Sequence, residues 1–152
     1  MINKKIPFVL IKTVINWYNK LQGVVRWNGA VSSTMHITSG VRKGGVLSPA
    51  LFNLYADVLI GALREFNHGC YLKGTFIGCI LYADDVLLLS ASLNDLQQML
   101  YKCMNVAETI GVKFNSAKSK CIVIGQNHCC IDKLGQLIFC NSVLKWDDKF
   151  KY

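Results

Sequence analysis

The chain has 152 residues, of which 52% are hydrophobic and 17% are charged, and its mean hydropathy is +0.30. This composition excludes an intrinsically disordered chain and suits one domain, or a piece of one, with a genuine core. Seventeen Lys and Arg residues against nine Asp and Glu give a net charge of +8, which favours a polyanionic partner such as nucleic acid.

The first segment predicts a helix. Pro7 opens a run of apolar residues at helical spacing, and Gly23 is expected to end it. The pattern is typical of a helix that packs in the core, through a face formed by Leu10, Val14, Trp17 and Leu21.

A β-hairpin is expected next. Residues 24–27 and 30–38 flank Asn28-Gly29, which is the strongest short signal for a tight hairpin turn. His36 alternates with apolar neighbours, and this favours a strand residue over a metal ligand.

A glycine-rich loop and a second helix follow. Residues 39–47 read S-G-V-R-K-G-G-V-L, and Ser48 and Pro49 suit the N-cap and the first helical position. Such a loop can bring backbone N–H groups close to phosphate, although the Walker pattern is absent. The helix is expected to reach about Asn67, to close at Gly69, and to bury Leu51, Phe52, Tyr55, Leu59, Leu63 and Phe66.

Residues 76–89 read F-I-G-C-I-L-Y-A-D-D-V-L-L-L and place two adjacent carboxylates between two apolar runs of strand length. Neighbouring carboxylates stay ionised only when a cation is bound or when they lie at a solvated turn. One interpretation is a β-hairpin whose tight turn presents Asp84 and Asp85 to a divalent metal. The other is an ordinary polar hairpin turn at residues 83–85.

Residues 76–93 also have the length of a membrane span. Two aspartates near the middle of such a span would cost about 2.5–3.5 kcal/mol each. The basic segment at residues 1–5 is not followed by an unbroken apolar run, because Lys12 and Asn16 interrupt it. We therefore expect a soluble intracellular protein with no membrane partner, in either the nucleus or the cytoplasm.

The sequence S-L-N-D at residues 92–95 is a capping box that opens a third helix, which Gly111 is expected to end. A basic turn at residues 111–120 should then lead into a buried strand at residues 121–124, and residues 137–140 form another strand-like run. The core stripe of the helix is expected to comprise Leu93, Leu96, Met99, Leu100, Cys103 and Ala107.

The seven cysteines are odd in number and form no C-x-x-C pair. With no secretory signal, reduced thiols are the expectation. A zinc module formed by His128, Cys129, Cys130 and Cys140 is the alternative, although adjacent cysteines fit one tetrahedral site poorly.

Three segments taken together resemble motifs B, C and D of reverse transcriptases, most closely those of non-LTR retrotransposons. They read G-V-R-K-G-G-V-L-S-P-A-L-F-N-L-Y at 40–55, Y-A-D-D-V-L-L-L-S at 82–90 and G-V-K-F-N-S-A-K-S-K at 111–120. The terminal F-K-Y is similar to the first half of motif E. The resemblance spans essentially the whole chain and implies an α+β fold: a partial palm subdomain, with an antiparallel sheet covered by helices on one face.

The resemblance also implies an RNA-directed DNA polymerase that uses two Mg²⁺ or Mn²⁺ ions, an RNA template, a DNA primer and deoxynucleotide triphosphates. Asp84 and Asp85 match the metal-binding acids, and Lys118 matches the lysine that orients or protonates pyrophosphate. The residues implied to contact nucleotide, primer or template are Arg42, Lys43, Gly44, Gly45, Ser48, Pro49, Tyr82 and Ala83.

Two departures from the family pattern shape the expectations. Position 43 is usually glutamine and is lysine here, and the motif A strand with its metal-binding aspartate should lie upstream of the Pro7 helix. We therefore expect a single partial domain, 1–152, without fingers, motif A or thumb. We expect it to be poorly soluble, because the acid hairpin would keep an unpaired apolar edge. We expect it to be inactive by itself, because the motif A aspartate is missing.

Two alternatives remain open beside the retrotransposon enzyme. One is a group II intron maturase or another reverse transcriptase lineage. The other is a non-catalytic nucleic-acid-binding remnant, which the charge of +8 also suits.

Overall fold

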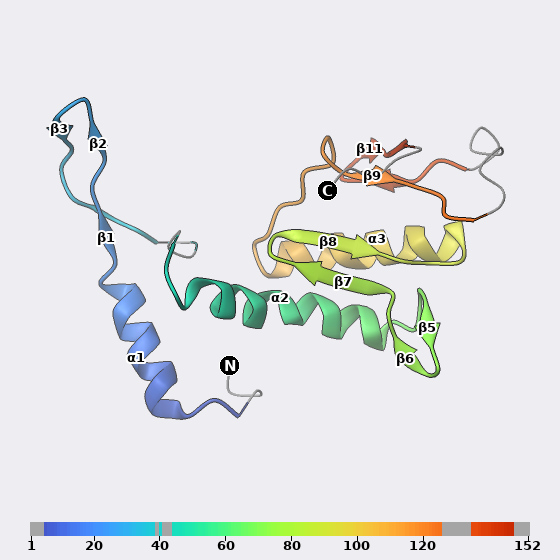
Figure 1. Cartoon of the computed structure of the whole chain (residues 1–152), viewed down its shortest axis with the longest axis horizontal. Coiled ribbons are helices and arrows are strands. Elements are labelled where there is room, and N and C mark those ends of the chain that lie inside the picture. Colours follow the sequence, from blue (N-terminus) through green and yellow to red (C-terminus); the bar gives the residue numbers. More distant parts are fainter. Residues whose placement is uncertain (1–4, 39, 41–43, 126–134, 148–152) are drawn as a thin grey trace. The chain divides into compact units, whose positions relative to one another are not determined.

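The computed structural model describes residues 5–38, 40, 44–125 and 135–147, and within them it is a mixed α+β structure of three helices and small two-stranded sheets (Figure 1). The chain divides into two compact units, residues 1–54 and residues 55–152. Each unit is described by itself below. Helix α2 (Ser48–Glu65) begins in the first unit and continues into the second.

The first unit opens with α1 (Phe8–Asn19), which starts directly after Pro7 as expected. The helix ends at Asn19 and not at Gly23, which lies in a strand. Ile11 is its one buried residue, whereas the side chains of Leu10 and Trp17 are 52% and 44% exposed. The expectation of a core-packing helix is therefore wrong in this structure. The other residues of the first unit cover too little of α1 to bury its apolar side chains.

Four short strands then form one β-ribbon. They are β1 (Gln22–Gly23), β2 (Arg26–Trp27), β3 (Ala30–Val31) and β4 (Met35–His36). Strands β2 and β3 pair next to the turn, β1 and β4 pair at the base, and the Ser32 N–H donates to the Val25 carbonyl between the two ladders (2.9 Å). The predicted turn is confirmed, since Asn28 and Gly29 have φ of 45° and 80°.

Helix α2 begins at Ser48, so this serine is the first helical residue and not the expected N-cap. Its N–H donates to the Gly45 carbonyl (3.1 Å). Leu59 and Leu63 are buried as expected, but Tyr55, one turn before Leu59 on the same face of the helix, is 44% exposed. The helix ends at Glu65, within two residues of the prediction.

The second unit continues with two hairpins in succession. Strands β5 (Tyr71–Leu72) and β6 (Thr75–Phe76) pair around Lys73-Gly74, whose φ angles are 48° and 79°. This hairpin was not predicted. Phe76 therefore ends the first hairpin, and the acid hairpin starts later, with β7 (Cys79–Tyr82) and β8 (Asp85–Leu88).

Helix α3 (Leu93–Thr109) follows, capped by Ser92, whose hydroxyl accepts a bond from the Asp95 N–H (3.3 Å). The capping box is only half formed, because the Asp95 carboxylate pairs with His68 Nδ1 (2.9 Å) and the Ser92 N–H donates to the Ser90 hydroxyl (3.2 Å). The helix closes before Gly111 as expected, and its stripe is confirmed by the burial of Met99, Leu100, Cys103 and Ala107.

The last described strands are β9 (Lys120–Cys121), β10 (Ile138–Phe139), β11 (Ser142–Val143) and β12 (Lys145–Trp146). The expected buried strand at 121–124 is wrong beyond Cys121, because Ile124 is 80% exposed. Strand β9 pairs in parallel with β12. The described strands thus form six two-stranded sheets, five antiparallel and one parallel, in place of the continuous antiparallel sheet that was expected.

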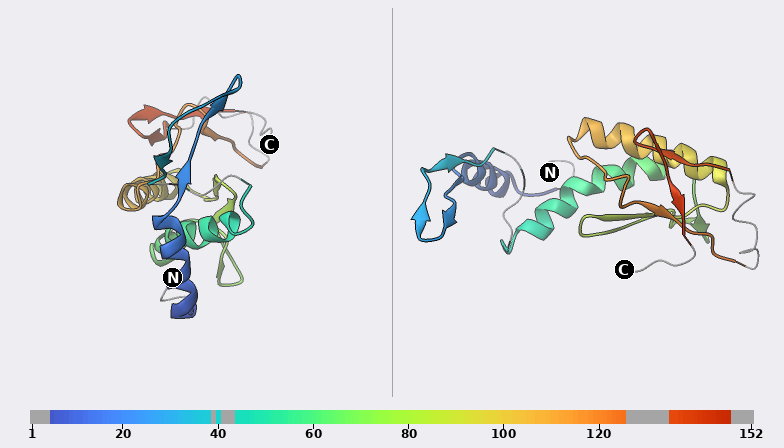
Figure 2. Two further views of the ribbon diagram at one scale, coloured as in Figure 1. Left: turned by 90° about the vertical axis from the view of Figure 1, so that its left-hand side faces the viewer. Right: turned by 90° about the horizontal axis from the view of Figure 1, so that it is seen from above.

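The core of the second unit joins its hairpins to its helices (Figure 2). One cluster is formed by Leu59, Leu63, Cys79, Met99 and Cys103, and the other by Leu100, Cys121, Leu137, Phe139 and Leu144. Since the first cluster contains residues of α2, β7 and α3, the acid hairpin is seated on both helices.

Candidate active site

The acid hairpin has two faces of different character. Its register pairs Cys79 with Leu88 and Leu81 with Val86, and Cys79, Val86 and Leu88 take part in the core cluster. The alternate pairs point away from the core: Ile80 with Leu87, which are 48% and 40% exposed, and Tyr82 with Asp85. Successive side chains of β7 and β8 thus point alternately into the core and away from it. The inward side chains anchor the hairpin, and with it the turn between the two strands.

The turn itself consists of Ala83 and Asp84, and Asp85 is the first residue of β8. Ala83 has a φ of 49°, a left-handed conformation that favours glycine. Both aspartates are exposed. Among the residues that the structure describes, neither carboxylate has an ion pair or a hydrogen bond. The predicted tight turn carrying the acid pair is thus present, with two adjacent anions that no cation of the described chain neutralises.

The donor set of this turn suits a hard divalent cation. Mg²⁺ is held in proteins by one or two carboxylates, with water and substrate phosphates completing its octahedral shell. Within the described ranges, no group of three or more His, Cys, Asp or Glu residues is arranged to hold a metal. Asp84 and Asp85 therefore fit a partial, open coordination site and not a closed structural one.

Of the other predicted site residues, Tyr82 and Ala83 lie beside the acid pair in the same hairpin, where Tyr82 pairs with Asp85. Gly44, Gly45, Ser48 and Pro49 lie in the first unit, where Gly44 has a φ of 74° and Ser48 is buried. Arg42 and Lys43 lie outside the described residues.

Lys118 belongs to the second unit, in an exposed turn. Its N–H donates to the Asn115 carbonyl (3.1 Å) and side chain (3.3 Å). These bonds hold the backbone of the turn. They do not involve the ammonium group of the Lys118 side chain. The nearby Lys120 pairs with Asp147, so the two basic residues have different surroundings.

The alternative zinc module falls mostly outside the described residues, which include neither His128, Cys129 nor Cys130, and the residues of the half motif E are also outside them. The five described cysteines are free thiols. Burial raises the pKa of Cys79 and of Cys121 to about 11 and that of Cys103 to about 12. These three thiols stay protonated near neutral pH and act as apolar core residues.

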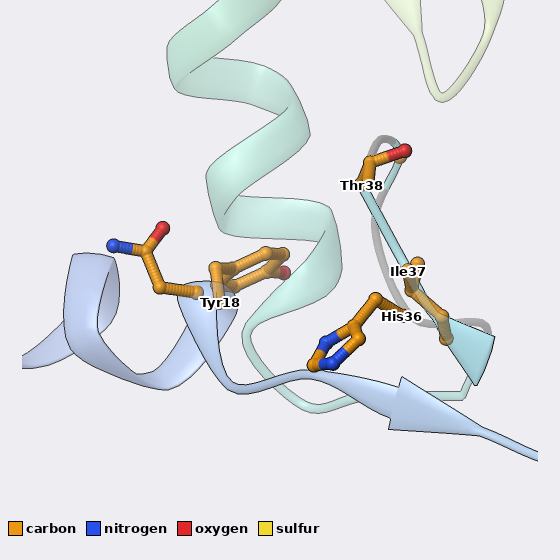
Figure 3. Close-up of a pocket in the computed structure, with 6 residues that line it drawn as sticks. Tyr18, His36, Ile37 and Thr38 are labelled. Atoms are coloured by element: carbon orange, nitrogen blue, oxygen red, sulfur yellow. The ribbon is translucent and has the colours of Figure 1, made fainter. Parts of the chain in front are cut away.

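A feature that the sequence reasoning missed is a hollow at the base of the ribbon in the first unit (Figure 3). It has a volume of about 560 Å³ and is lined by Tyr18, Asn19, His36, Ile37, Thr38 and Gly40. Figure 3 shows the Tyr18 ring and the His36 imidazole on neighbouring sides of it. His36 is a strand residue as predicted, but its position beside an aromatic ring follows only from the pairing of β1 with β4.

No helix in the described ranges is long and apolar enough to cross a membrane. The apolar window around the acid pair is divided instead between two short strands and a turn.

Comparison with known proteins gives one family. Residues 2–152 match the family model described as reverse transcriptase (RNA-dependent DNA polymerase). The chain is 33% identical over 86 residues to the retrovirus-related Pol polyprotein from type-2 retrotransposable element R2DM of Drosophila melanogaster. The aligned residues are 57% of the chain and 8% of that protein.

Two further relatives agree. The Pol polyprotein from type-1 retrotransposable element R2 of Nasonia vitripennis is 41% identical over 61 residues, which is 40% of the chain and 6% of that protein. The transposon TX1 uncharacterized 149 kDa protein of Xenopus laevis is 30% identical over 111 residues, which is 71% of the chain and 8% of that protein. The chain therefore spans less than a tenth of the length of these three relatives. Because the family model matches nearly its whole length, the chain belongs to the reverse transcriptase (RNA-dependent DNA polymerase) family.

Proposed function

We propose that this chain is palm sequence of an RNA-directed DNA polymerase of the non-LTR retrotransposon type. The observation that carries the proposal is the exposed acid pair at the turn of a core-anchored hairpin, in a chain that belongs to the reverse transcriptase family. The reaction forms a bond between the primer 3′ oxygen and the α-phosphorus of a deoxynucleotide triphosphate. The bond from that phosphorus to the bridging oxygen breaks, and pyrophosphate leaves.

Asp84 and Asp85 are the residues that would hold the divalent metal. When bound, Mg²⁺ or Mn²⁺ neutralises the charge that develops on the attacking and leaving oxygens. Tyr82 and Ala83 precede the acids in the same turn, and the proposal assigns them to the primer terminus. Ala83 holds a glycine-favouring φ of 49°, the kind of uncommon backbone conformation that is often found at functional sites.

The remaining assignments follow the family motifs. Lys118 would orient pyrophosphate or give it a proton, for which its exposed ammonium group is available. The segment ahead of α2 would line the nascent base pair and the template, and its assigned residues are Arg42, Lys43, Gly44, Gly45, Ser48 and Pro49. The lysine at position 43 replaces the usual glutamine, and we propose that it contacts phosphate and not a base edge.

We also propose that the 152-residue chain does not catalyse DNA synthesis by itself. Two carboxylates form only part of the site that two metals need, and the described residues offer no cluster of three ligands. The outward pair of Ile80 and Leu87 is half exposed in this structure. A strand laid beside the hairpin would extend its two-stranded sheet into the continuous palm sheet, and would bring the further carboxylate.

Primer extension tests the catalytic assignment. An RNA template, a DNA primer, deoxynucleotides and Mg²⁺ are incubated with the 152-residue chain, and with the longer protein where the gene encodes one. We expect no extension by the chain and extension by the longer protein, reduced at least about a hundredfold by Asp84→Asn. The matched control is Asp95→Asn, an acid of the same unit that pairs with His68.

Metal binding gives a second readout that does not depend on activity. Mn²⁺ added to the 152-residue chain should broaden the NMR signals of residues 82–86, and the Asp84→Asn, Asp85→Asn double variant should remove this effect. Extension by the 152-residue chain alone would contradict the proposed need for a further carboxylate. Extension that survives Asp84→Asn would contradict the metal assignment.

The competing function is nucleic-acid binding without catalysis, which the net charge of +8 favours. It predicts salt-dependent binding that the Asp84→Asn and Asp85→Asn variants leave intact, and no extension by any version of the protein. A group II intron maturase would share the palm chemistry and would be recognised by the domains that flank it.

A further inference from the structure

The positive charge of the chain is concentrated in its first unit. Residues 1–54 contain seven basic residues and no Asp or Glu, and the first acid of the chain is Asp57. Residues 55–152 contain ten basic and nine acidic residues. The basic residues of the first unit are Lys4, Lys5, Lys12, Lys20, Arg26, Arg42 and Lys43. An acid-free segment of this length attracts a polyanion throughout, since no carboxylate offsets its field.

The β-ribbon of this unit carries an aromatic side chain that its neighbours do not cover. Trp27 is 81% exposed, and its direct partner across the ribbon is Ala30, whose methyl group is too small to shield an indole. Asn28 and Gly29 make the turn immediately beyond it. The tip of the ribbon therefore presents a flat apolar ring to its surroundings.

Two exposed cationic side chains belong to this surface, one beside the ring at the tip and one at the base of the ribbon. Arg26 precedes Trp27 in β2 and is exposed, and Lys20 is exposed where the chain leaves α1 for β1. Consecutive strand residues point to opposite faces, so the guanidinium group and the indole lie on either side of the same tip. A chain that wraps the tip meets both.

At the base of the ribbon, the hollow offers hydrogen-bonding groups of the kind that read base edges. They are a phenol, an amide, an imidazole and a hydroxyl, from Tyr18, Asn19, His36 and Thr38. Base and tip thus combine polar groups, cations and an open aromatic surface, and no acid of the first unit opposes them.

We propose that this ribbon surface, defined by Tyr18, Lys20, Arg26, Trp27 and His36, binds single-stranded nucleic acid. Trp27 stacks on an unpaired base while Lys20 and Arg26 contact phosphates. A single strand is the fitting occupant, because its bases have free faces for stacking and those of a duplex do not. The proposal rests on the proposed function, and it identifies a contact for template that does not involve the acid pair.

The test is fluorescence anisotropy with labelled RNA and DNA single strands of about 20 nucleotides and the full 152-residue chain. Trp27→Ala should raise Kd about fivefold or more, and Trp27→Phe should restore most of the affinity. The matched control is Phe8→Ala, which removes an aromatic side chain of the same unit that is 71% exposed but lies on α1. Circular dichroism checks that the variants keep their secondary structure.

The charge contribution is tested by salt dependence. Arg26→Gln should reduce the slope of log K against log salt by about 0.7, the value for one phosphate contact on a single strand. Lys113→Gln, an exposed lysine of the second unit, should leave the slope unchanged.

Three results would overturn the proposal. The first is unchanged affinity in Trp27→Ala, and the second is an equal loss in Phe8→Ala. The third is binding to duplex, or to vesicles of anionic lipid, that depends on Trp27 as strongly as single-strand binding does. The two proposals can fail separately. If Trp27→Ala leaves strand binding unaltered while Asp84→Asn abolishes primer extension by the longer protein, the ribbon contact alone is refuted. Trp27-dependent binding by the chain, with no primer extension by the longer protein either, would refute the polymerase proposal alone.

Discussion

The two units of this chain differ in both charge and burial. The first has seven basic residues, no acid, and Ile11 as the one buried apolar side chain in its described part. The second has nearly balanced charge and two apolar clusters whose buried residues join α2 and α3 to the three strands β7, β9 and β10. The second unit therefore has the means to hold its shape, whereas the first has a surface that suits a polyanion and little core to stabilise it.

The difference suggests a division of roles along the chain. In the second unit, burial on one face of β7 and β8 supports the acid turn on the other side of the hairpin. In the first unit, the apolar residues Leu10, Trp17 and Trp27 remain exposed. Rigid support and open contact surface are separate tasks, and here they lie in separate parts of the sequence.

The largest effect is expected from a cavity in the core of the second unit, which tests whether that unit has the tight packing that the first unit lacks. Leu63→Ala removes a side chain that is 0% exposed at the centre of the first cluster. We expect a loss of about 2–5 kcal/mol in the free energy of unfolding, measured by urea denaturation followed by circular dichroism. Val58→Ala on the same helix, at 53% exposure, is the control and should change this free energy by less than about 0.5 kcal/mol. Equal effects of the two changes would show that the second unit has no tight core.

The next largest effect is a pH dependence of the free energy of unfolding, which the buried thiols should cause. Burial raises the pKa of Cys103 from 9.0 to about 12, so between these values the unfolded chain loses a proton that the folded chain keeps. The contribution of Cys103 to the free energy of unfolding should then fall as pH rises above about 9, by up to about 1.4 kcal/mol per pH unit. Below pH 9 this thiol adds no pH dependence, because it is protonated in both states.

The slope is measured by urea denaturation between pH 8 and about 10.5. Cys103→Ala should make the slope shallower but not remove it, because Cys79 and Cys121 also have a raised pKa. Cys140→Ala, which alters an exposed thiol, should leave it unchanged. A slope that is the same in the wild type and in Cys103→Ala would mean that the thiol is not buried in solution.

A matched pair of glycines gives the smallest effect and compares the units most directly. Gly29 and Gly111 have φ of 80° and 69°, and a Cβ on either would meet nothing within 4 Å. An alanine at each costs about 1–2 kcal/mol of backbone strain and no steric clash. Gly111→Ala should lower the free energy of the main unfolding transition by about 1 kcal/mol. Gly29→Ala should leave that transition in place and weaken only the ribbon, which hydrogen exchange of its amides would report. Equal shifts of the main transition would show that both units unfold together.

Local signals in the sequence predicted the parts of the fold that depend on local interactions. Asn28-Gly29 predicted the turn of the ribbon, S-L-N-D predicted the start of α3, and Gly111 predicted its end, because backbone conformation and capping are set by neighbouring residues. The acid hairpin was predicted from two apolar runs of strand length on both sides of two adjacent carboxylates, and the pairing of β7 with β8 confirms it. Lys73-Gly74 carried a similar turn signal and was overlooked.

Tertiary packing decided what these local signals could not. Asp95 was expected to complete a capping box and pairs instead with His68, a residue brought near it only by the fold. The parallel pairing of β9 with β12 joins segments that the sequence pattern does not relate. The helical spacing of α1 was read correctly, but burial depends on what lies opposite a face, and its first unit leaves most of that face exposed.

The same division applies to the site. The sequence by itself determined that two carboxylates lie at a turn between apolar strands, since two apolar runs of strand length around a polar pair suffice for that. Only the tertiary structure showed which hairpin face is packed, how exposed Asp84 and Asp85 are, and that Trp27 stands open at the tip of the ribbon. The physical reason is that charge and periodicity belong to the chain, whereas exposure depends on which distant residues pack against it.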